Sequence, residues 1–315
     1  MTRPYLKILG KLFPLVGIAL LVYIVLDIGP GKIITAFLTI PWYYYFLALL
    51  VFLPRMFLYA YKWQYISRKQ QMDLPLLFLA KIFLISLFYG GVTPGAIGLH
   101  LRIYYLKEKA QTTLEKCIAN SFIDSTLSFL SGLFLALIGS VLLASTLPGL
   151  TLTIAAVFIL FVGLFILFMT QKVAKRLFRG AIRLLVPRNF KELAGESLES
   201  LYEDMPRLRD MIVPFVLECI ILLIAATQVY MLSLAFSLPI PYGTFVLLSV
   251  TSVVIGNALP ITVGGLGVRE GAFVVFLSQY GVPAETAFVL SLGGYLVKIL
   301  LPGIFGWSLS LRKKQ

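Results

Sequence analysis

The sequence predicts an all-α integral membrane protein with six spanning helices and two re-entrant helical hairpins in an inverted-repeat arrangement. Of its 315 residues, 59% are hydrophobic and 13% are charged, whereas soluble domains are about half apolar and a quarter charged. The mean hydropathy is +0.94. The apolar stretches are long and continuous, which indicates helices rather than alternating strands. A soluble enzyme, a nucleic-acid-binding module and a disordered chain are therefore nearly excluded.

Six apolar stretches are long enough to cross a hydrocarbon core of about 30 Å as helices. They are residues 12–28, 42–61, 117–143, 150–169, 212–237 and 284–309. The first stretch lacks a small-residue cleavage site, so we interpret it as a retained span rather than a signal peptide. We predict that the whole chain forms one polytopic membrane domain. Its parts are a first half (1–147), a linking span with a cytoplasmic amphipathic segment (148–211) and a second half (212–315).

Two further apolar stretches are each interrupted by clustered Gly and Pro. The interruptions lie at residues 90–98 and 256–267. Gly and Pro break helices, and in lipid a broken helix survives only where protein or a wet cavity surrounds it. About ten apolar residues follow each break, which is too few to cross the bilayer. We therefore predict two re-entrant hairpins, with arms near 74–91 and 97–107, and near 243–259 and 267–280.

The basic residues predict the orientation in the membrane. With both termini in the cytoplasm, 22 of the 27 Lys+Arg fall in inner segments and one, Lys32, falls outside. The other four lie within membrane segments: Arg55, Lys81, Arg269 and Lys298. This asymmetry favours a cell-membrane protein in which the first hairpin inserts from the cytoplasm and the second from outside. It also explains the net charge of +13 without a nucleic-acid partner.

The two breaks resemble each other. Residues 93–100 align without a gap with residues 262–269, in the pattern Thr, any, Gly, small, apolar, Gly, apolar, basic. Eight positions can also match by chance. Insertion from opposite faces, however, is what inverted repeats produce, and matched broken helices are the best sequence pointer to a transport site.

Ionisable side chains inside a bilayer are costly unless paired or hydrated, which makes them functional candidates. Here they are Arg55, Lys81, Asp124, Glu218, Arg269, Glu270 and Lys298, with His100 and Arg102 just after the first break. For Lys81, Glu218 and Lys298 the sequence favours structural pairing or snorkelling. Arg269 and Glu270 follow the glycines of the second break directly. Because adjacent helical residues point about 100° apart, we do not expect these two to pair with each other. We expect one to pair with another element while the other faces the cavity.

The breaks also predict an anion-binding site. Each returning arm begins at a helix N-terminus, which attracts anions, and Arg102 and Arg269 can bind phosphate oxygens. Asp124 and Glu270 would pair with these arginines or contact a cationic or sugar head group. The predicted site comprises Pro94, Gly95, Gly98, His100, Arg102, Asp124, Pro260, Thr262, Gly264, Gly265, Gly267, Arg269 and Glu270. Packing by small residues is the alternative, but it explains the glycines and not the adjoining charges.

Enzymatic chemistry has little support in the sequence. His100 is the only histidine, and Cys117 and Cys219 lie beside or within apolar runs. We therefore expect no metal, no cofactor and no disulfide framework. An acid pair, Asp124 with Glu218 or Glu270, leaves acid–base chemistry as a minor alternative. The polar segment 171–211 predicts amphipathic helices on the inner leaflet.

Residues 259–271, followed by Tyr280-Gly281-Val282-Pro283, resemble the signature of the lysylphosphatidylglycerol synthase transmembrane region, also called the flippase-like domain or UPF0104 family. The Pro-x-Thr-x-Gly-Gly-x-Gly-x-x-Glu pattern is quite specific. Weaker matches are Tyr61-Lys62-Trp63, residues 93–98 and Arg102-Ile103-Tyr104-Tyr105-Leu106, so the resemblance covers nearly the whole chain. One departure is Leu99-His100, where many relatives have Gly-Asp. The polar role of this position is therefore in question, although His100 can substitute.

The resemblance implies a multi-span domain that moves an anionic or aminoacylated lipid between leaflets. Larger relatives fuse it to an aminoacyltransferase or a glycosyltransferase. Because the chain ends at Gln315, we expect neither catalytic domain and do not carry over the synthase activity. We expect a flippase for an anionic phospholipid or a polyprenyl-phosphate-linked sugar. The alternatives are a non-transporting subunit of a separate glycosyltransferase or aminoacyltransferase, and an intramembrane enzyme on lipid-linked substrates. The sequence leaves open the lipid, the direction and whether the chain forms homo-oligomers.

Overall fold

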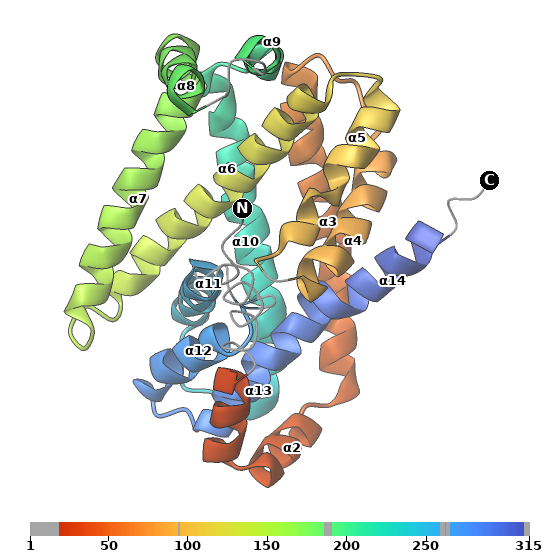
Figure 1. Cartoon of the computed structure of the whole chain (residues 1–315). Coiled ribbons are helices and arrows are strands. Elements are labelled where there is room, and N and C mark those ends of the chain that lie inside the picture. Colours follow the sequence, from red (N-terminus) through yellow and green to blue (C-terminus); the bar gives the residue numbers. More distant parts are fainter. Residues whose placement is uncertain (1–18, 94, 186–190, 259–261, 263–264, 312–315) are drawn as a thin grey trace.

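The computed structural model describes residues 19–93, 95–185, 191–258, 262 and 265–311. Every regular element in these ranges is a helix, which confirms the predicted all-α class, whereas the re-entrant and inverted-repeat arrangement stays a prediction (Figure 1). The main helices are Ala19–Ile28, α2 (Pro30–Thr39), α3 (Trp42–Lys69), α4 (Leu76–Val92), α5 (Arg102–Ala110), α6 (Leu114–Val141), α7 (Pro148–Met169), α8 (Gln171–Leu185), α9 (Lys191–Tyr202), α10 (Ile212–Ser233), α11 (Tyr242–Ala258), α12 (Val268–Ser278), α13 (Ala284–Tyr295) and α14 (Leu301–Leu311).

Five helices in the described ranges are long and apolar enough to cross a membrane, or six if a bent pair counts as one span. The bent pair is Ala19–Ile28 with α2, and its two helices meet at 84°. Gly29 takes a φ of 96° and Pro30 begins the next helix, so the chain turns sharply here. The segment around Lys32, which we expected to be a loop, is therefore helical.

The second span is longer than the sequence predicted. The predicted span ended at residue 61, which left Lys62 in a cytoplasmic segment, but α3 continues to Lys69. Trp63 and Ile66 are fully buried, so packing extends the helix beyond the strongly apolar run. As a result, Lys62 is buried and does not belong to a cytoplasmic loop.

Both interrupted stretches break where the Gly and Pro clusters predicted. The first interrupted stretch consists of α4 and, after the 3₁₀ turn η1 (Ile97–Leu101), α5. The second consists of α11 and α12. In Figure 1, α5 lies in the upper half of the molecule and α11 and α12 lie in the lower half. Insertion of the two hairpins from opposite faces of a bilayer stays a prediction.

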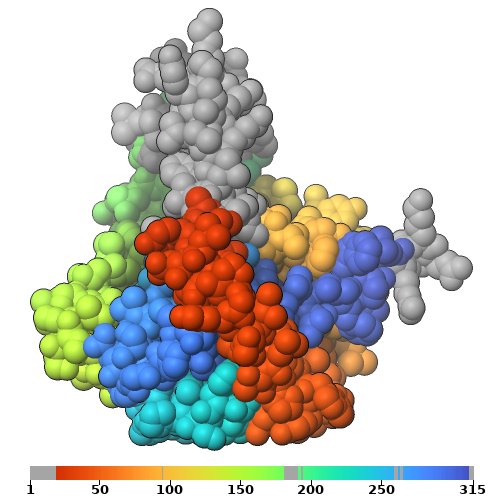
Figure 2. Space-filling model, turned by 90° about the horizontal axis from the view of Figure 1, so that it is seen from below, coloured from red at the N-terminus to blue at the C-terminus, as the bar shows by residue number. Residues whose placement is uncertain are grey.

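Helices from the two predicted halves are interleaved. α10 packs along α3, and α14 packs along α4. The contact between α14 and α4 is close, since a Cβ added at Gly306 would lie 2.1 Å from the carbonyl oxygen of Leu84. The N-terminal α2 packs against α13, and the view from below shows the N-terminal helices lying across the C-terminal ones (Figure 2). The centre of the molecule is therefore built jointly by both halves.

The polar segment forms α8 and α9, beyond the upper end of α7 in Figure 1. Arg179 Nη2 lies 2.5 Å from Glu199 Oε1, and Lys175 pairs with the same carboxylate. Hydrogen bonds from these two cations lower the pKa of Glu199 below its usual range. Leu177 and Phe178 are exposed on α8, and a membrane surface would cover such an apolar face.

Candidate functional site

The two helix breaks meet in the centre of the molecule. The backbone N–H of Gly95 donates a hydrogen bond of 3.2 Å to the carbonyl oxygen of Thr262. A single site formed by both breaks requires that the two breaks lie close together, as they do here. Pro94, Pro260 and Gly264 lie outside the described residues.

The first break folds directly back onto α4. The Thr93 hydroxyl donates to the carbonyl oxygen of Tyr89 at 2.7 Å, and the N–H of Gly98 donates to the same hydroxyl at 2.8 Å. A Cβ on Gly98 would lie 2.1 Å from Tyr89 O, so only glycine fits at this position. Gly95 and Ala96 have φ values of 60° and 54°, which reverse the chain direction.

The second break ends in a helix N-terminus that its own carboxylate caps. Gly265 and Gly267 have φ values of 74° and 86°, and Gly267 precedes α12. The N–H of Gly267 donates to Glu270 Oε2 at 2.7 Å. Thr262 is 2% exposed, and among the described residues its hydroxyl has no hydrogen-bond partner. Glu270 therefore occupies part of the position that we expected an anionic ligand to take.

The expectation that Arg269 and Glu270 do not pair with each other is wrong. Arg269 Nε donates to Glu270 Oε1 at 3.0 Å, and Nη2 contacts the same oxygen. Glu270 turns back toward the start of α12, and the long side chain of Arg269 bridges the angle between adjacent positions. Ser291 Oγ lies 3.4 Å from Glu270 Oε1, and the Arg269 guanidinium lies 4.9 Å from the centre of the Tyr295 ring.

Tyr295 on α13 joins the two breaks. Its ring lies against Arg269, and its hydroxyl donates to the carbonyl oxygen of Gly91 at 2.9 Å. We expect Tyr295→Phe to lower the free energy of unfolding by about 0.5–1.5 kcal/mol, because one buried hydrogen bond is lost while the ring stays. Thermal unfolding of the purified protein measures this change. A loss no larger than that of Tyr61→Phe, at an exposed tyrosine, would contradict it.

A second group of buried charges lies between α3, α5, α6 and α10 and is neutral overall. Lys62 Nζ lies 2.6 Å from Asp124 Oδ1 and 2.6 Å from Glu218 Oε2. Arg102 Nη1 lies 2.5 Å from Asp124 Oδ2, and Tyr59 donates to that oxygen at 2.7 Å. We call Lys62, Arg102, Asp124 and Glu218 the neutral cluster. Its two cations and two carboxylates compensate each other.

Arg102 is fully engaged within the protein. Its five N–H groups meet Asp124, the Tyr59 hydroxyl, the Ser121 hydroxyl, the Ser121 carbonyl and the Ser125 hydroxyl, at 2.5–2.9 Å. A lipid phosphate would have to displace one of these acceptors to bind Arg102. His100, also in the predicted site, is exposed, and its Nδ1 lies 3.1 Å from Ser121 Oγ.

A third group of charges surrounds the pair Arg269 and Glu270. Arg55 Nη1 donates to Gln228 Oε1 at 2.5 Å, and its Nη2 donates to the carbonyl oxygen of Lys298 at 3.0 Å. Lys298 lies in a π-helical turn (Leu296–Leu300) between α13 and α14. Such turns free carbonyl groups and often mark functional sites. We call Arg55, Arg269, Glu270 and Lys298 the cationic cluster.

Residues 12–306 match the family described as the lysylphosphatidylglycerol synthase TM region. The chain belongs to this family. It is also similar to a UPF0104 membrane protein of Methanothermobacter thermautotrophicus, with 24% identity over 299 residues that cover 87% of this chain and 86% of the relative. These matches confirm the family that the sequence motifs indicated. The family match and the apolar helices together identify a multi-pass membrane protein.

Sequence reasoning missed three residues of the site in this family member: Lys62, Gln228 and Tyr295. A signal for Lys62 was present, since Arg55, Tyr59 and Lys62 are spaced i, i+4 and i+7 and share one helix face. Gln228 and Tyr295 carry no comparable signal, because their partners lie far away in the chain.

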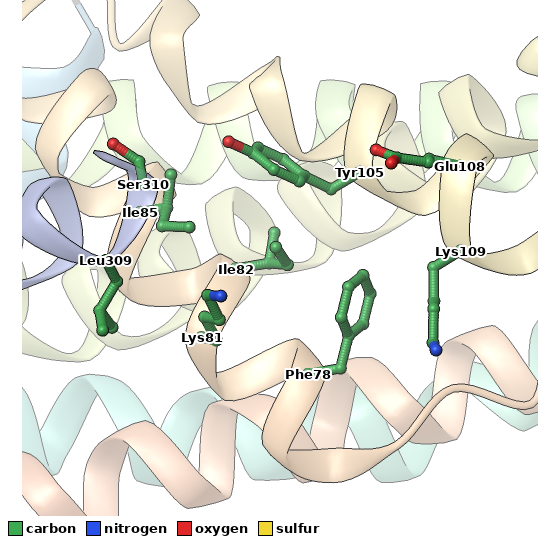
Figure 3. A pocket seen from close by; sticks show the side chains of 9 residues that line it. All are labelled: Phe78, Lys81, Ile82, Ile85, Tyr105, Glu108, Lys109, Leu309 and Ser310. Carbon is green, nitrogen blue, oxygen red and sulfur yellow. The ribbon is translucent and has the colours of Figure 1, made fainter. Parts of the chain in front are cut away.

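Lys81, another candidate, lies outside both clusters. It lines a cavity of about 270 Å³ between α4, α5 and α14 (Figure 3). The cavity is walled by Phe78, Ile82, Ile85 and Leu309, with Tyr105, Glu108, Lys109 and Ser310 as its other residues. Lys81 is exposed, and the snorkelling interpretation stays a prediction.

Proposed function

We propose that this protein is a lipid flippase that moves an anionic phospholipid or a polyprenyl-phosphate-linked sugar between leaflets. The observation that carries the proposal is the contact between the two helix breaks, from Gly95 to Thr262, beside buried charged side chains. Matched broken helices of two halves are typical of transport sites near the membrane midplane.

The head group would cross at this junction while the acyl or prenyl chains stay in lipid. An anionic head group competes with Glu270 for Arg269, and the released carboxylate can contact a cationic or sugar group. The exposure of the site would alternate as one half rocks against the other. The ion pair between Arg269 and Glu270 means that a bound anion and the internal carboxylate can replace each other at Arg269.

We propose transport without chemistry. Asp124, Glu218 and Glu270 each form an ion pair with Lys or Arg, so internal partners already occupy their oxygens. We also propose that the protein lies in the cell membrane with both termini in the cytoplasm, where a separate glycosyltransferase or aminoacyltransferase could supply its lipid.

Leaflet exchange of fluorescent lipids in proteoliposomes tests the proposal. We expect the wild-type protein to expose inner-leaflet lipid to an external quencher faster than protein-free vesicles do. Glu270→Gln should slow the exchange at least about tenfold, since a difference of 1.4 kcal/mol in the barrier corresponds to that factor. Glu203→Gln, at an exposed carboxylate, serves as the matched control.

The lipid panel contains phosphatidylglycerol, phosphatidylcholine and a polyprenyl-phosphate sugar. Unchanged exchange in both Arg269→Ala and Glu270→Ala would refute the site assignment. No exchange by the wild-type protein with any lipid would refute the flippase and favour the non-transporting subunit. Product formation without exchange would favour an intramembrane enzyme.

A further inference from the structure

The buried charges in the centre of the molecule do not balance. All 14 Asp and Glu of the chain lie in the described ranges, so the inventory of carboxylates is complete. In the two clusters, five buried cations face three buried carboxylates: Arg55, Lys62, Arg102, Arg269 and Lys298 against Asp124, Glu218 and Glu270. The centre therefore carries a net charge of +2 when all these groups are ionised.

The excess belongs to the cationic cluster. The neutral cluster compensates itself, as its ion pairs of 2.5–2.6 Å show. In the cationic cluster Glu270 is the only acid, and Arg269 already engages it. Among the described residues, Arg55 donates only to neutral acceptors, the amide oxygen of Gln228 and a backbone carbonyl, although Glu218 also acts on it electrostatically.

Among the described residues, no carboxylate forms an ion pair with Lys298. Its side chain is 8% exposed, and its ammonium makes no hydrogen bond or ion pair within the part of the chain that the structure describes. The charges that act on it are those of Arg269 and Arg55, which repel it, and of Glu270, which attracts it. An isolated ammonium in this environment is strongly unfavourable unless an anion joins it.

Arg55 and Lys298 both lie near the middle of long apolar helices. Arg55 follows the start of α3 by 13 residues and precedes its end by 14, and Lys298 stands at the corresponding midpoint of the span Ala284–Leu311. At about 1.5 Å of rise per residue, each is about 20 Å from either helix end, too far to snorkel.

We propose that Arg55, Lys298 and Arg269 form the site that binds the phosphate of the transported head group. Arg55 and Arg269 offer forked N–H donors and Lys298 a point charge, and together they match a phosphate group of charge −1 to −2. Arg102, by contrast, has its five donors satisfied. The identity of the phosphate as part of a transported lipid rests on the proposed function. The binding of an anion does not, because it follows from the excess positive charge.

The test is the thermal stability of the delipidated full chain in neutral detergent, titrated with phosphatidylglycerol, phosphatidylcholine or inorganic phosphate. Phosphatidylglycerol should raise the melting temperature of the wild-type protein, and phosphatidylcholine should raise it much less. Lys298→Met should melt at or above the wild-type temperature without lipid, because an uncompensated charge is gone. Its apparent Kd for phosphatidylglycerol should rise at least about tenfold.

Lys298→Arg keeps the charge and should keep the lipid response. Lys81→Met, at an exposed lysine beside the cavity of Figure 3, is the matched control and should respond as the wild-type protein does. Saturable competition by inorganic phosphate would support a phosphate site and identify the phosphate as the recognised group.

An unchanged apparent Kd in Lys298→Met would overturn the proposal, as would an equal response to phosphatidylcholine. Failure of Lys298→Met to fold would also overturn it, since removal of an unpaired charge is expected to stabilise the protein. Leaflet exchange measured in parallel distinguishes a failure of the phosphate-site proposal from a failure of the flippase proposal. A protein that binds phosphatidylglycerol through Lys298 but exchanges no lipid would refute the flippase and leave the phosphate site intact.

Discussion

Asp124→Asn is expected to lower the free energy of unfolding by about 3–5 kcal/mol, the usual cost of removing one partner from a buried ion-pair network. The carboxylate of Asp124 contacts Lys62 Nζ at 2.6 Å, Arg102 Nη1 at 2.5 Å and the Tyr59 hydroxyl at 2.7 Å. Without its charge, the neutral cluster holds two buried cations and only Glu218. Thermal or chemical unfolding of the purified protein measures the loss.

Asp73→Asn is the matched control, because Asp73 forms an exposed ion pair of 3.3 Å with Arg68. Such a surface pair contributes about 0–1 kcal/mol. Asp124→Asn combined with Lys62→Met restores neutrality and should recover part of the loss. Equal stability of Asp124→Asn and Asp73→Asn would show that the neutral cluster does not hold the spans together.

Gly98→Ala is expected to reduce leaflet exchange to the level of protein-free vesicles and to destabilise the protein by about 1–3 kcal/mol, as overpacking usually does. The added Cβ would lie 2.1 Å from the backbone carbonyl oxygen of Tyr89 and 2.3 Å from its carbonyl carbon. The first break must therefore move. Movement would disturb the hydrogen bonds through Thr93 and the contact from Gly95 to Thr262.

Gly163→Ala provides the control for this substitution. Gly163 lies within α7, and a Cβ there would meet nothing within 4 Å. Alanine favours a helix over glycine by about 1 kcal/mol, so this variant should be at least as stable as the wild-type protein and should exchange lipid normally. A Gly98→Ala protein that exchanges lipid at the wild-type rate would mean that the precise shape of the first break does not matter for transport.

The helices were predictable because hydropathy and helix breakers act over short stretches of chain. The arms near 74–91 and 243–259 correspond to α4 and α11, and the breaks follow where glycine and proline cluster. The end of α3 was not predictable in the same way. Lys62 lowers the local hydropathy, but the packing of Trp63 and Ile66 against other helices carries the helix onward.

The sequence named charged residues near the two breaks as members of one candidate site, but it did not predict how they pair. The sequence placed Arg102, Asp124, Arg269 and Glu270 in one site, and the structure shows Arg102 with Asp124 and Arg269 with Glu270. The second pair contradicts the expected directions of adjacent helical residues. The capping of the Gly267 N–H by Glu270 is a local interaction, but its effect on Arg269 depends on Tyr295 and Ser291, which come from another helix.

By itself, the sequence determined that the chain is a helical membrane protein with two broken helices and charges beside the breaks, because composition and spacing control these properties locally. Only the tertiary structure decided which charges compensate one another. It buried Lys62 between Asp124 and Glu218, and it left Lys298 beside Arg55 without a carboxylate. The pairing depends on the depth and rotation of helices that are distant in the chain, and hydropathy carries no information about either.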